Sequence, residues 1–256
     1  MIVTQDFVQT CYNDYINQIG KDRKEHFYVG HEDKYSASGA GQCVKKHWYK
    51  THGYPESPPG IRSNRLLRLG TIVHEDIQNA IIKYKNELIR GKEEGMIPII
   101  NDIHIEMCVE IPSLNVRGHC DDLRVNIASA KAVIYDFKTA HSFKWQKMFG
   151  HTKNRDKNPN HNYELQIGTY AQGLSLKLGI SPYDIEMILL YYKKDDSSIR
   201  EVRVDQYWME AATDYWGQVM LALEDVNEPD DLPRGNEGIP YEGWECSYCP
   251  FEKICK

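Results

Sequence analysis

Two pairs of charged residues on neighbouring predicted strands could carry out metal-assisted chemistry. Asp136 and Lys138 lie in the apolar segment 133–139 (VIYDFKT), which predicts a buried strand. Because successive strand side chains alternate between faces, Asp136 and Lys138 point to the same side. The acidic pair Asp121 and Asp122 precedes them by fifteen residues. Such a layout suits metal-assisted attack on a phosphodiester, since carboxylates hold a divalent cation and a lysine can polarise the attacking water.

Several side chains are candidates for this chemistry. We predict that Asp121 and Asp136 bind Mg²⁺ or Mn²⁺, that the Phe137 carbonyl adds a ligand, and that Lys138 acts on the water. The Asp-x-Lys triplet is common by itself, and a surface salt bridge is the alternative interpretation. Asp122 competes with Asp121 but should face the other side of its strand, and Glu106 on the preceding strand is an additional candidate.

Two helical motifs flank the acidic residues. His74 lies upstream in segment 70–75 (GTIVHE), and Gln166 and Tyr170 lie downstream at a spacing of four, which places both on one helix face. In isolation His74 would be interpreted as a histidine at the edge of the core. Gln166 and Tyr170 would be a polar helix edge.

With these residues together, the chain resembles the PD-(D/E)xK nucleases and, within them, the RecB-like exonuclease family. The family pattern is Gly-x-x-x-His, Gly-x-x-Asp, Asp-x-Lys and Gln-x-x-x-Tyr, and this chain has the same order over roughly residues 36–256. The proline that names the superfamily is missing before Asp121. The resemblance implies metal ligation by His74, Asp121 and Asp136, catalysis by Lys138, and positioning of nucleic acid or of the active-site network by Gln166 and Tyr170.

Cysteines form a second constellation. The chain has 7, an odd count without secretory context, which argues against a disulfide framework. Cys246, Cys249 and Cys255 are clustered near the end, and a C-x-x-C pair can grip one metal centre. Cys43 is the natural fourth ligand of such a site. The other three, Cys11, Cys108 and Cys120, are predicted to be small buried apolar residues.

The same resemblance suggests the kind of metal centre. RecB-like nucleases with an iron–sulfur cluster, including CRISPR-associated exonucleases and AddB-type subunits, have one cysteine before the nuclease core and three after it. The resemblance therefore implies a structural [4Fe–4S] cluster bound by Cys43, Cys246, Cys249 and Cys255. Zinc held by the four cysteines is the alternative.

Composition and charge limit the class of protein. The chain has 256 residues, of which 41% are hydrophobic, and a net charge of −6. Its longest apolar runs are too short to span a bilayer, and its first residues do not form a secretory signal, so we expect a cytoplasmic protein of cellular or viral origin. Segment 141–161 is basic despite the overall charge, and a solvated loop is its simplest interpretation.

The basic segment could also guide a nucleic-acid strand by phosphate contacts and stacking. Its candidate DNA-binding residues are Lys144, Trp145, Lys147, Lys153 and Arg155. A possible extension of this path consists of Lys45, Lys46, Arg62, Arg65 and Arg68.

Hydrophobic periodicity gives the element order. We predict helices at 4–19, 42–50, 64–90, 162–178 and 205–223, and strands at 103–111, 116–125, 131–138, 185–193 and 198–204. This order predicts an α/β fold with a mixed central sheet flanked by helices, which the resemblance describes as a restriction-endonuclease-like nuclease core. We expect this core at 64–225. Segments 1–63 and 226–256, the latter an acidic linker and the cysteine cluster, should form one compact unit joined by the metal centre.

Together these features predict a divalent-metal-dependent DNA exonuclease that acts on single strands or ends. The alternative is a non-catalytic iron–sulfur or zinc DNA-processing subunit on a nuclease scaffold, which the complete set of Asp121, Asp136 and Lys138 disfavours. DNA is the expected partner. A homo-oligomer or an association with recombination or CRISPR machinery is compatible with the resemblance, and no membrane partner is expected.

Overall fold

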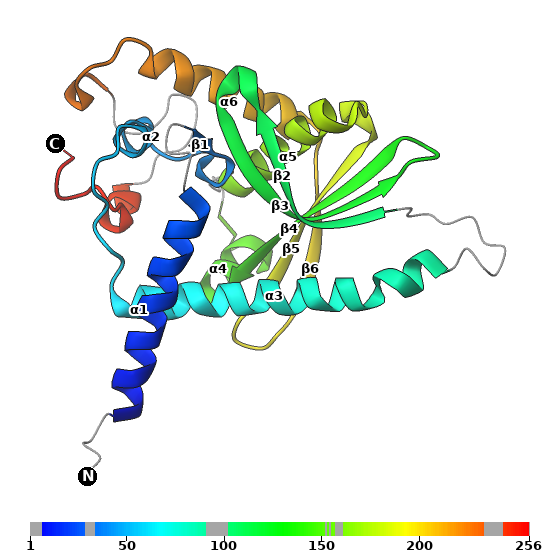
Figure 1. Ribbon diagram of the computed structural model, residues 1–256, viewed down its shortest axis with the longest axis horizontal. Helices are drawn as coiled ribbons and strands as arrows, with labels where there is room; N and C mark the ends of the chain where they lie inside the picture. The colour runs from blue at the N-terminus through cyan, green and yellow to red at the C-terminus, as the bar shows by residue number, and fades with distance from the viewer. Residues whose placement is uncertain are drawn as a thin grey trace.

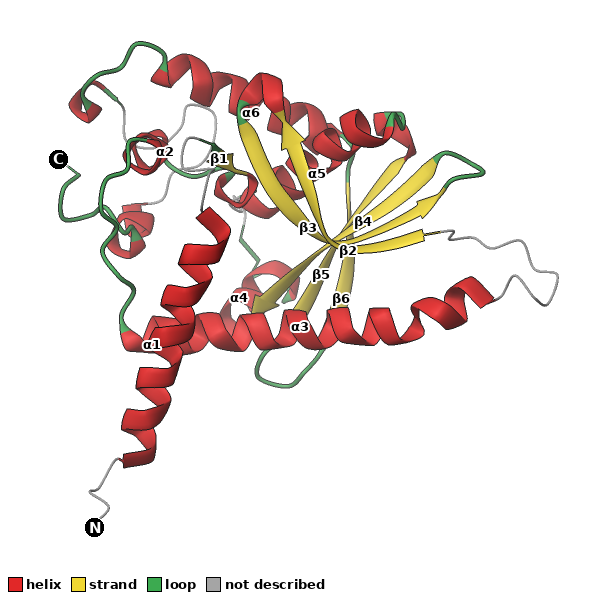
Figure 2. Ribbon diagram, viewed as in Figure 1, coloured by secondary structure: helices red, strands yellow, loops and turns green. Residues whose placement is uncertain are grey.

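A mixed β-sheet lies at the centre of the protein. The computed structural model describes residues 7–28, 34–90, 102–151, 153, 155, 156, 161–232 and 243–255. In this part of the chain a six-stranded sheet has helices on both faces (Figures 1 and 2). The predicted α/β class with a mixed central sheet is therefore confirmed.

The strands and helices follow most of the predicted segments. The strands are β1 (Tyr35–Ser36), β2 (Asp102–Ile111), β3 (Val116–Asn126), β4 (Lys131–Ala140), β5 (Ile185–Lys193) and β6 (Ile199–Val204). The helices are α1 (Phe7–Tyr28), α2 (Val44–Thr51), α3 (Ile61–Arg90), α4 (Ser142–Phe149), α5 (Asn162–Leu178) and α6 (Tyr207–Leu223). Short 3₁₀ turns include η1 (Ala37–Gly39) and η5 (Gly243–Tyr248).

Two predicted segments differ from the structure. The first helix extends to Tyr28, and α4 occupies the start of the predicted basic loop. Helix α4 begins where two side chains satisfy its first backbone N–H groups: Asp195 accepts from Ser142 N at 2.6 Å, and His141 accepts from Lys144 N at 3.4 Å. These caps stabilise a short helix that hydrophobic periodicity did not reveal.

The sheet divides along one edge of β3. β2 pairs antiparallel with β3 over nearly its whole length. On the other edge, β4 pairs only as far as Asp122↔Tyr135, and β1 pairs only at Val116 and Arg117. Residues 118–121 therefore lie between the two partner strands, where β3 and β4 diverge. We call this gap the fork.

Helices cover the two faces of the sheet unequally. α5 and α6 bury the larger core, which includes Leu123, Ile134, Ile167 and Trp216. α3 crosses the opposite face, where Ile77 and Ile81 pack against Tyr135, Phe137 and Ile188. The catalytic candidates thus lie in a sheet that is fixed from both sides (Figure 1).

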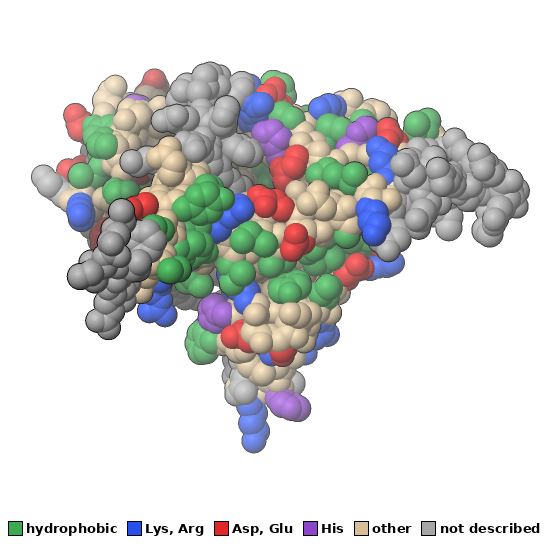
Figure 3. Space-filling view, turned by 60° about the horizontal axis from the view of Figure 1, so that its bottom comes forward, with side chains coloured by type: hydrophobic (Ala, Val, Ile, Leu, Met, Phe, Trp, Pro, Cys, Tyr) green, Lys and Arg blue, Asp and Glu red, His purple; other side chains and the backbone are tan. Residues whose placement is uncertain are grey.

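Several apolar side chains in the first half of α3 are exposed rather than packed on the sheet. Leu66, Leu69 and Ile72 follow the predicted helical periodicity, but they are 50%, 42% and 37% exposed. This half faces α1, where Asn13 Oδ1 accepts a 3.0 Å hydrogen bond from Arg65 Nε. Figure 3 shows hydrophobic and acidic side chains together on the surface seen from this side.

Helix α2 and the loop after it pack against the C-terminal segment. A small core contains Trp48 and Tyr49 from α2 and Phe251 from the C-terminal segment. The rings of Tyr49 and Phe251 stack with centroids 5.3 Å apart, and Ser57 N donates to Pro250 O at 2.9 Å. Part of the predicted acidic linker, residues 233–242, lies outside the described residues. None of the described helices is long and apolar enough to cross a membrane.

Candidate active site at the fork

The fork brings Asp121 and Asp136 together. Asp121 lies at the end of the gap in β3, and Asp136 follows the last residue of β4 that pairs with β3. The backbone N–H of Phe137, which would otherwise continue the ladder, donates to Asp121 Oδ2 at 2.5 Å. The two carboxylates are 8% and 2% exposed. Two nearly buried acids therefore share one opening in the sheet, as the motif spacing predicted.

Lys138 is held by a network that includes both predicted residues of α5. Its Nζ lies 2.5 Å from Asp136 Oδ2 and donates to Gln166 Oε1 at 2.9 Å. The Gln166 amide donates to Asp136 Oδ1 at 3.3 Å and to the Tyr170 hydroxyl at 2.8 Å. Gln166 thus uses its carbonyl and both amide hydrogens to join Lys138, Asp136 and Tyr170.

Gly118 is required by close packing at the fork. A Cβ at this position would lie 2.6 Å from the Ala37 Cβ and 2.8 Å from Tyr170 Cε1. Both contacts are shorter than side-chain carbons tolerate. The glycine of the Gly-x-x-Asp motif therefore admits the Tyr170 ring, and through it positions Gln166.

Burial and neighbouring charge perturb the acid–lysine pair. Burial raises the pKa of Asp136 to about 6, with Lys138 opposing this change and Asp121 adding to it. Burial by itself would lower the pKa of Lys138, but Asp136, Tyr163 and Asp121 raise it overall. Lys138 is consequently charged. Asp121 is a second buried carboxylate beside Asp136, so the site keeps a negative charge that a bound cation could balance.

His74 approaches the acids from the other side of the sheet. Its Nδ1 lies 3.7 Å from Asp121 Oδ1, and its ring meets Phe137 edge-on at 5.8 Å between centroids. One helical turn later, the buried Gln78 donates to Glu106 Oε1 at 2.7 Å. Glu106 is exposed and has a left-handed backbone with φ of 51°. Its tie to Gln78 keeps this additional acidic candidate beside the helix that positions His74.

The donor set at the fork fits a divalent cation. Oxygen and imidazole ligands about 2.1 Å from one ion lie about 3–4 Å apart, and the His74–Asp121 separation of 3.7 Å falls in this range. Asp136 Oδ2 is buried and, among the described residues, has no hydrogen bond besides its ion pair with Lys138. No group of three or more His, Cys, Asp or Glu in the described ranges is already closed around a metal position. At the fork, Phe137 N–H contacts Asp121 Oδ2 and Lys138 contacts Asp136 Oδ2.

Asp122 faces away from the fork. It is fully buried, and its Oδ2 accepts from Arg124 Nε at 2.8 Å. The Arg124 guanidinium in turn lies 4.4 Å from the Tyr135 ring centroid. This confirms that adjacent strand residues point to opposite faces, and it gives Asp122 a structural ion pair.

The predicted DNA-binding residues in and after α4 differ in their exposure and in their contacts. Trp145 is partly buried, packs against the core and meets Phe149 edge-on at 4.8 Å, so part of its ring is engaged in packing. Phe143 is instead 68% exposed and stacks on His141 at 6.1 Å. The cations of this segment have protein partners: Lys144 donates to Tyr163 Oη at 2.5 Å, Lys147 pairs with Asp156 at 3.7 Å, and Arg155 donates to Gly150 O at 3.0 Å. Lys153 is exposed.

The suggested extension of the basic path is only partly available. Lys45 is 4% exposed and lies in the core, so it does not contribute to a surface path. Arg65 is bound to Asn13, and Arg68 pairs with Glu75 at 3.2 Å. Lys46 remains near the surface beside a pocket between α2 and the C-terminal segment.

Sequence reasoning missed three residues at the site. Gln78 positions Glu106, Tyr163 lies under Lys138 with 4.7 Å between its ring centroid and Nζ, and Phe143 is the exposed aromatic ring. Helical spacing could have revealed two of them. Gln78 lies four residues after His74, and Tyr163 lies three before Gln166, so each shares a helix face with a motif residue.

The predicted cysteine ligands gather at the junction of α2 and the C-terminal segment. Cys43 precedes α2, and Cys249 and Cys255 pack against the Tyr49–Phe251 core. Burial raises the pKa of Cys249, and the thiols of Cys43 and Cys255 add to this. Cys246 O accepts from Cys249 N at 3.0 Å. The four thiols are partly exposed and form no disulfide, and in the described part of the chain they are not arranged as a closed group around a metal position.

The remaining cysteines differ from one another. Cys120 is fully buried, as predicted, whereas Cys11 is exposed on α1, where the prediction of a buried residue is wrong. Cys108 is half-buried and its Sγ accepts from Arg117 Nε at 3.4 Å. None of the three lies with the cluster at the C-terminal segment.

Comparison with known proteins identifies the family. The sequence model of the PD-(D/E)XK nuclease superfamily matches residues 78–256. The chain belongs to this superfamily. The matched range contains Asp121, Asp136 and Lys138, and it starts after His74 and Cys43. PD-(D/E)XK nucleases generally use divalent metals such as Mg²⁺ or Mn²⁺, which agrees with the acids at the fork. No curated protein matches the chain.

Solved structures share the fold of this PD-(D/E)XK chain. SSO0001 has a TM-score of 0.55 and 17% identity, and the match covers 95% of this chain and 96% of that one. A candidate exonuclease from Eubacterium rectale has a TM-score of 0.50 and 16% identity, with 83% and 88% covered. At such low sequence identity, the similarity to these two structures shows a shared fold alone.

Proposed function

We propose that the protein is a divalent-metal-dependent deoxyribonuclease that hydrolyses phosphodiester bonds, as an exonuclease on single strands or DNA ends. The observation that carries this proposal is the network of Asp136, Lys138 and Gln166 beside Asp121 at the fork. A structural ion pair would not require a glutamine, a tyrosine and a glycine to be arranged around it. The non-catalytic alternative offers no reason for such an arrangement.

Each residue of the fork has a place in this reaction. Asp121, Asp136 and His74 would hold the cation, with the Phe137 carbonyl as a further predicted ligand. When bound, the cation supplies a water of lowered pKa and neutralises charge on the phosphate. Lys138 orients the attacking water through its ammonium hydrogens, and Gln166 fixes that ammonium group at 2.9 Å. Tyr170 holds the other end of Gln166.

The substrate preference is supported by the surface beside β4. The exposed Phe143 ring, flanked by His141 and by Lys147 at 5.2 Å from its centroid, offers a stacking platform next to a cation. Unpaired bases stack on such platforms without sequence preference. Lys144, Lys147, Lys153 and Arg155 would add phosphate contacts along the same segment.

We also propose that Cys43, Cys246, Cys249 and Cys255 bind a structural [4Fe–4S] cluster, with zinc as the alternative. The proximity of Cys249 to the thiols of Cys43 and Cys255 supports one shared centre. Such a centre would join the N-terminal and C-terminal segments, which already contact each other through Tyr49 and Phe251. Protein purified without oxygen should contain about four irons per chain. Stoichiometric zinc without iron would decide for the alternative.

Digestion of end-labelled DNA tests the nuclease. We expect the wild-type protein with Mn²⁺ or Mg²⁺ to degrade single-stranded or end-containing substrates and to leave circular duplex intact. The isosteric variant Asp136→Asn should lose this activity. Asp122→Asn is the matched control, because that neighbouring acid faces away and the amide oxygen can still accept from Arg124. Equal activity in Asp136→Asn and wild type would refute the proposal.

A further inference from the structure

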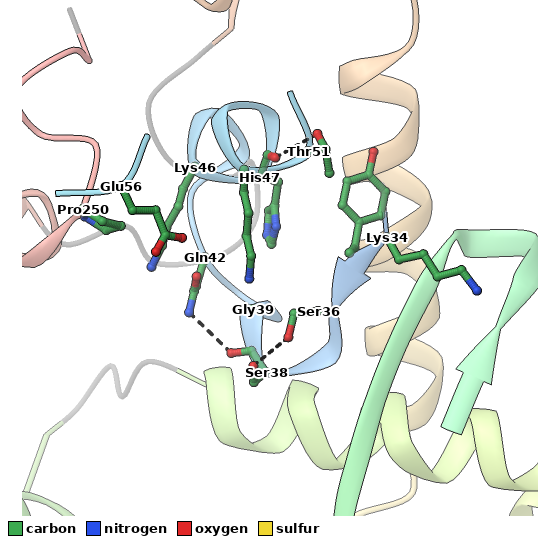
Figure 4. A pocket seen from close by; sticks show the side chains of 12 residues that line it. Lys34, Ser36, Ser38, Gly39, Gln42, Lys46, His47, Thr51, Glu56 and Pro250 are labelled. Atoms are coloured by element: carbon green, nitrogen blue, oxygen red, sulfur yellow. Dashed lines mark hydrogen bonds between the residues drawn. The ribbon is translucent and has the colours of Figure 1, made fainter. Parts of the chain in front are cut away.

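A polar pocket lies beside the fork, between η1, α2 and the C-terminal segment (Figure 4). Its volume is about 170 Å³, enough for a phosphate group with several waters, since a water takes about 30 Å³ of the liquid. Hydroxyl, amide and ammonium groups dominate its lining. They include Ser36, Ser38, Gln42, Lys46, Lys50 and Thr51.

The charge of this pocket is mainly positive. Lys34, Lys46 and Lys50 line it, and Glu56 is the acid among its lining residues. Lys34 is turned to Glu110, with 3.4 Å between Nζ and Oε1, and the other two lysines, Lys46 and Lys50, belong to α2. Lys46 is partly buried in this lining. A desolvated ammonium group gains most from an anion placed beside it.

One hydroxyl of a hydrogen-bonded serine pair can donate into the pocket. Ser36 Oγ and Ser38 Oγ are 2.8 Å apart and share one hydrogen bond. Only one of their two hydrogens is used in that bond, so the other hydroxyl can donate to a ligand. Gln42 Nε2 donates to Ser38 O at 3.4 Å, which fixes the turn that presents both serines (Figure 4).

The pocket is connected to the catalytic network by a short chain of contacts. Ala37 lies between the two serines. Its side chain and the Tyr170 ring both lie so close to Gly118 that a Cβ on this glycine would clash with each of them. Tyr170 contacts Gln166, which binds Lys138. On the opposite wall, Pro250 belongs to the cysteine-bearing segment. The pocket therefore lies between the fork and the predicted metal centre.

We propose that this pocket binds a phosphate group of the same nucleic-acid strand that is cut at the fork. The inference rests on the proposed nuclease function and adds a second anchoring point to it. Ammonium groups suit phosphate as point charges, and hydroxyl and amide donors direct its oxygens. The phosphate is either a terminal monoester or an internal diester, since both present the same anionic oxygens.

Binding measured without cleavage tests the pocket directly. Fluorescence anisotropy in EDTA should give Kd values for labelled single-stranded oligonucleotides with a 5′-phosphate, a 3′-phosphate or neither. We expect Lys46→Gln and Lys50→Gln each to raise Kd about tenfold, as for loss of one charge-assisted contact, and to lower the salt slope by about one. Lys131→Gln, at the exposed start of β4, is the matched control. A terminal-phosphate site predicts the loss for one phosphorylated end only, and a diester site predicts it for all three.

Kinetics separate this inference from the proposed function. With Mn²⁺, both variants should raise KM while kcat stays within about twofold of wild type, because the pocket contacts no reacting atom. Variants that bind and cleave like Lys131→Gln would overturn the inference and leave the nuclease intact. A wild-type protein that binds DNA but does not cleave it would refute the nuclease, and the anisotropy series would still decide the pocket. Lys50→Gln provides the test if Lys46→Gln does not fold.

Discussion

Gln166 accepts a 2.9 Å hydrogen bond from Lys138, and this contact joins α5 to the end of β4. The lysine ammonium is thereby held between an amide oxygen and the Asp136 carboxylate, above the Tyr163 ring. A lysine with four rotatable bonds would otherwise sample many positions. The contact fixes it in one of them at the point where β3 and β4 separate.

Removing the Gln166 amide should mainly slow the chemical step. Gln166→Ala releases Lys138 and Tyr170 without removing a predicted metal ligand. We expect kcat to fall roughly tenfold to a hundredfold, as for loss of an outer-shell partner, with KM little changed. Steady-state kinetics on single-stranded DNA would measure this. Gln172→Ala, on the same helix, is the control, and an equal loss in both variants would contradict the assignment.

A methyl group at Gly118 should destabilise the fork. Gly118→Ala places a Cβ against Ala37 and the Tyr170 ring, and overpacking of this kind costs about 1–3 kcal/mol. Gly217→Ala on α6 meets nothing within 4 Å, and it should stabilise the helix by about 1 kcal/mol. Urea denaturation would compare the two. Similar free energies of unfolding for both variants would show that Gly118 is not confined.

His47 should make the protein sensitive to acid. Burial lowers its pKa from 6.5 to about 3, with Lys46 and Lys50 adding to the change. Between these values the unfolded chain binds more protons than the folded one, so the free energy of unfolding decreases as pH falls through this window. The stabilisation is complete above about pH 6.5. Denaturation at several pH values should show a flatter dependence for His47→Gln, whose amide can still reach Tyr215, and an unchanged slope would contradict this account.

Phe251 should hold the C-terminal segment in place. It is 1% exposed and stacks on Tyr49, so Phe251→Ala should cost about 3–5 kcal/mol. The cysteine-bearing segment should then become susceptible to limited proteolysis. Ile254→Ala, at a position 40% exposed, should change little. Equal resistance of all three proteins would mean that other contacts hold this segment.

The spacing of apolar residues along the chain explains which helices and strands could be predicted. α5 begins and ends at the predicted residues because its apolar positions repeat at helical spacing and Gly179 adopts the left-handed conformation with φ of 64°. β4 and β5 have continuous apolar runs, as expected for strands covered on both faces. The helix predicted from residue 205 begins at Tyr207, where Asp205 Oδ1 accepts from Tyr207 N at 2.8 Å.

Long-range packing explains what could not be predicted. The fork depends on β1 taking the edge of β3 that β4 leaves, and a two-residue strand has no periodicity to recognise. Trp145 and Phe143 are both aromatic residues of a basic segment, but only the helical geometry of α4 turns one inward and leaves the other exposed. Gln78 has a partner 28 residues away in sequence, which no local pattern indicates.

Manganese binding tests the central claim most directly. If His74, Asp121 and Asp136 form one cation site, electron paramagnetic resonance should detect Mn²⁺ bound to the DNA-free wild-type protein. This signal should be lost in Asp136→Asn and retained in Asp122→Asn, with all three proteins folded by circular dichroism. Unchanged Mn²⁺ binding by Asp136→Asn would contradict the account, because the fork would then not be the metal site.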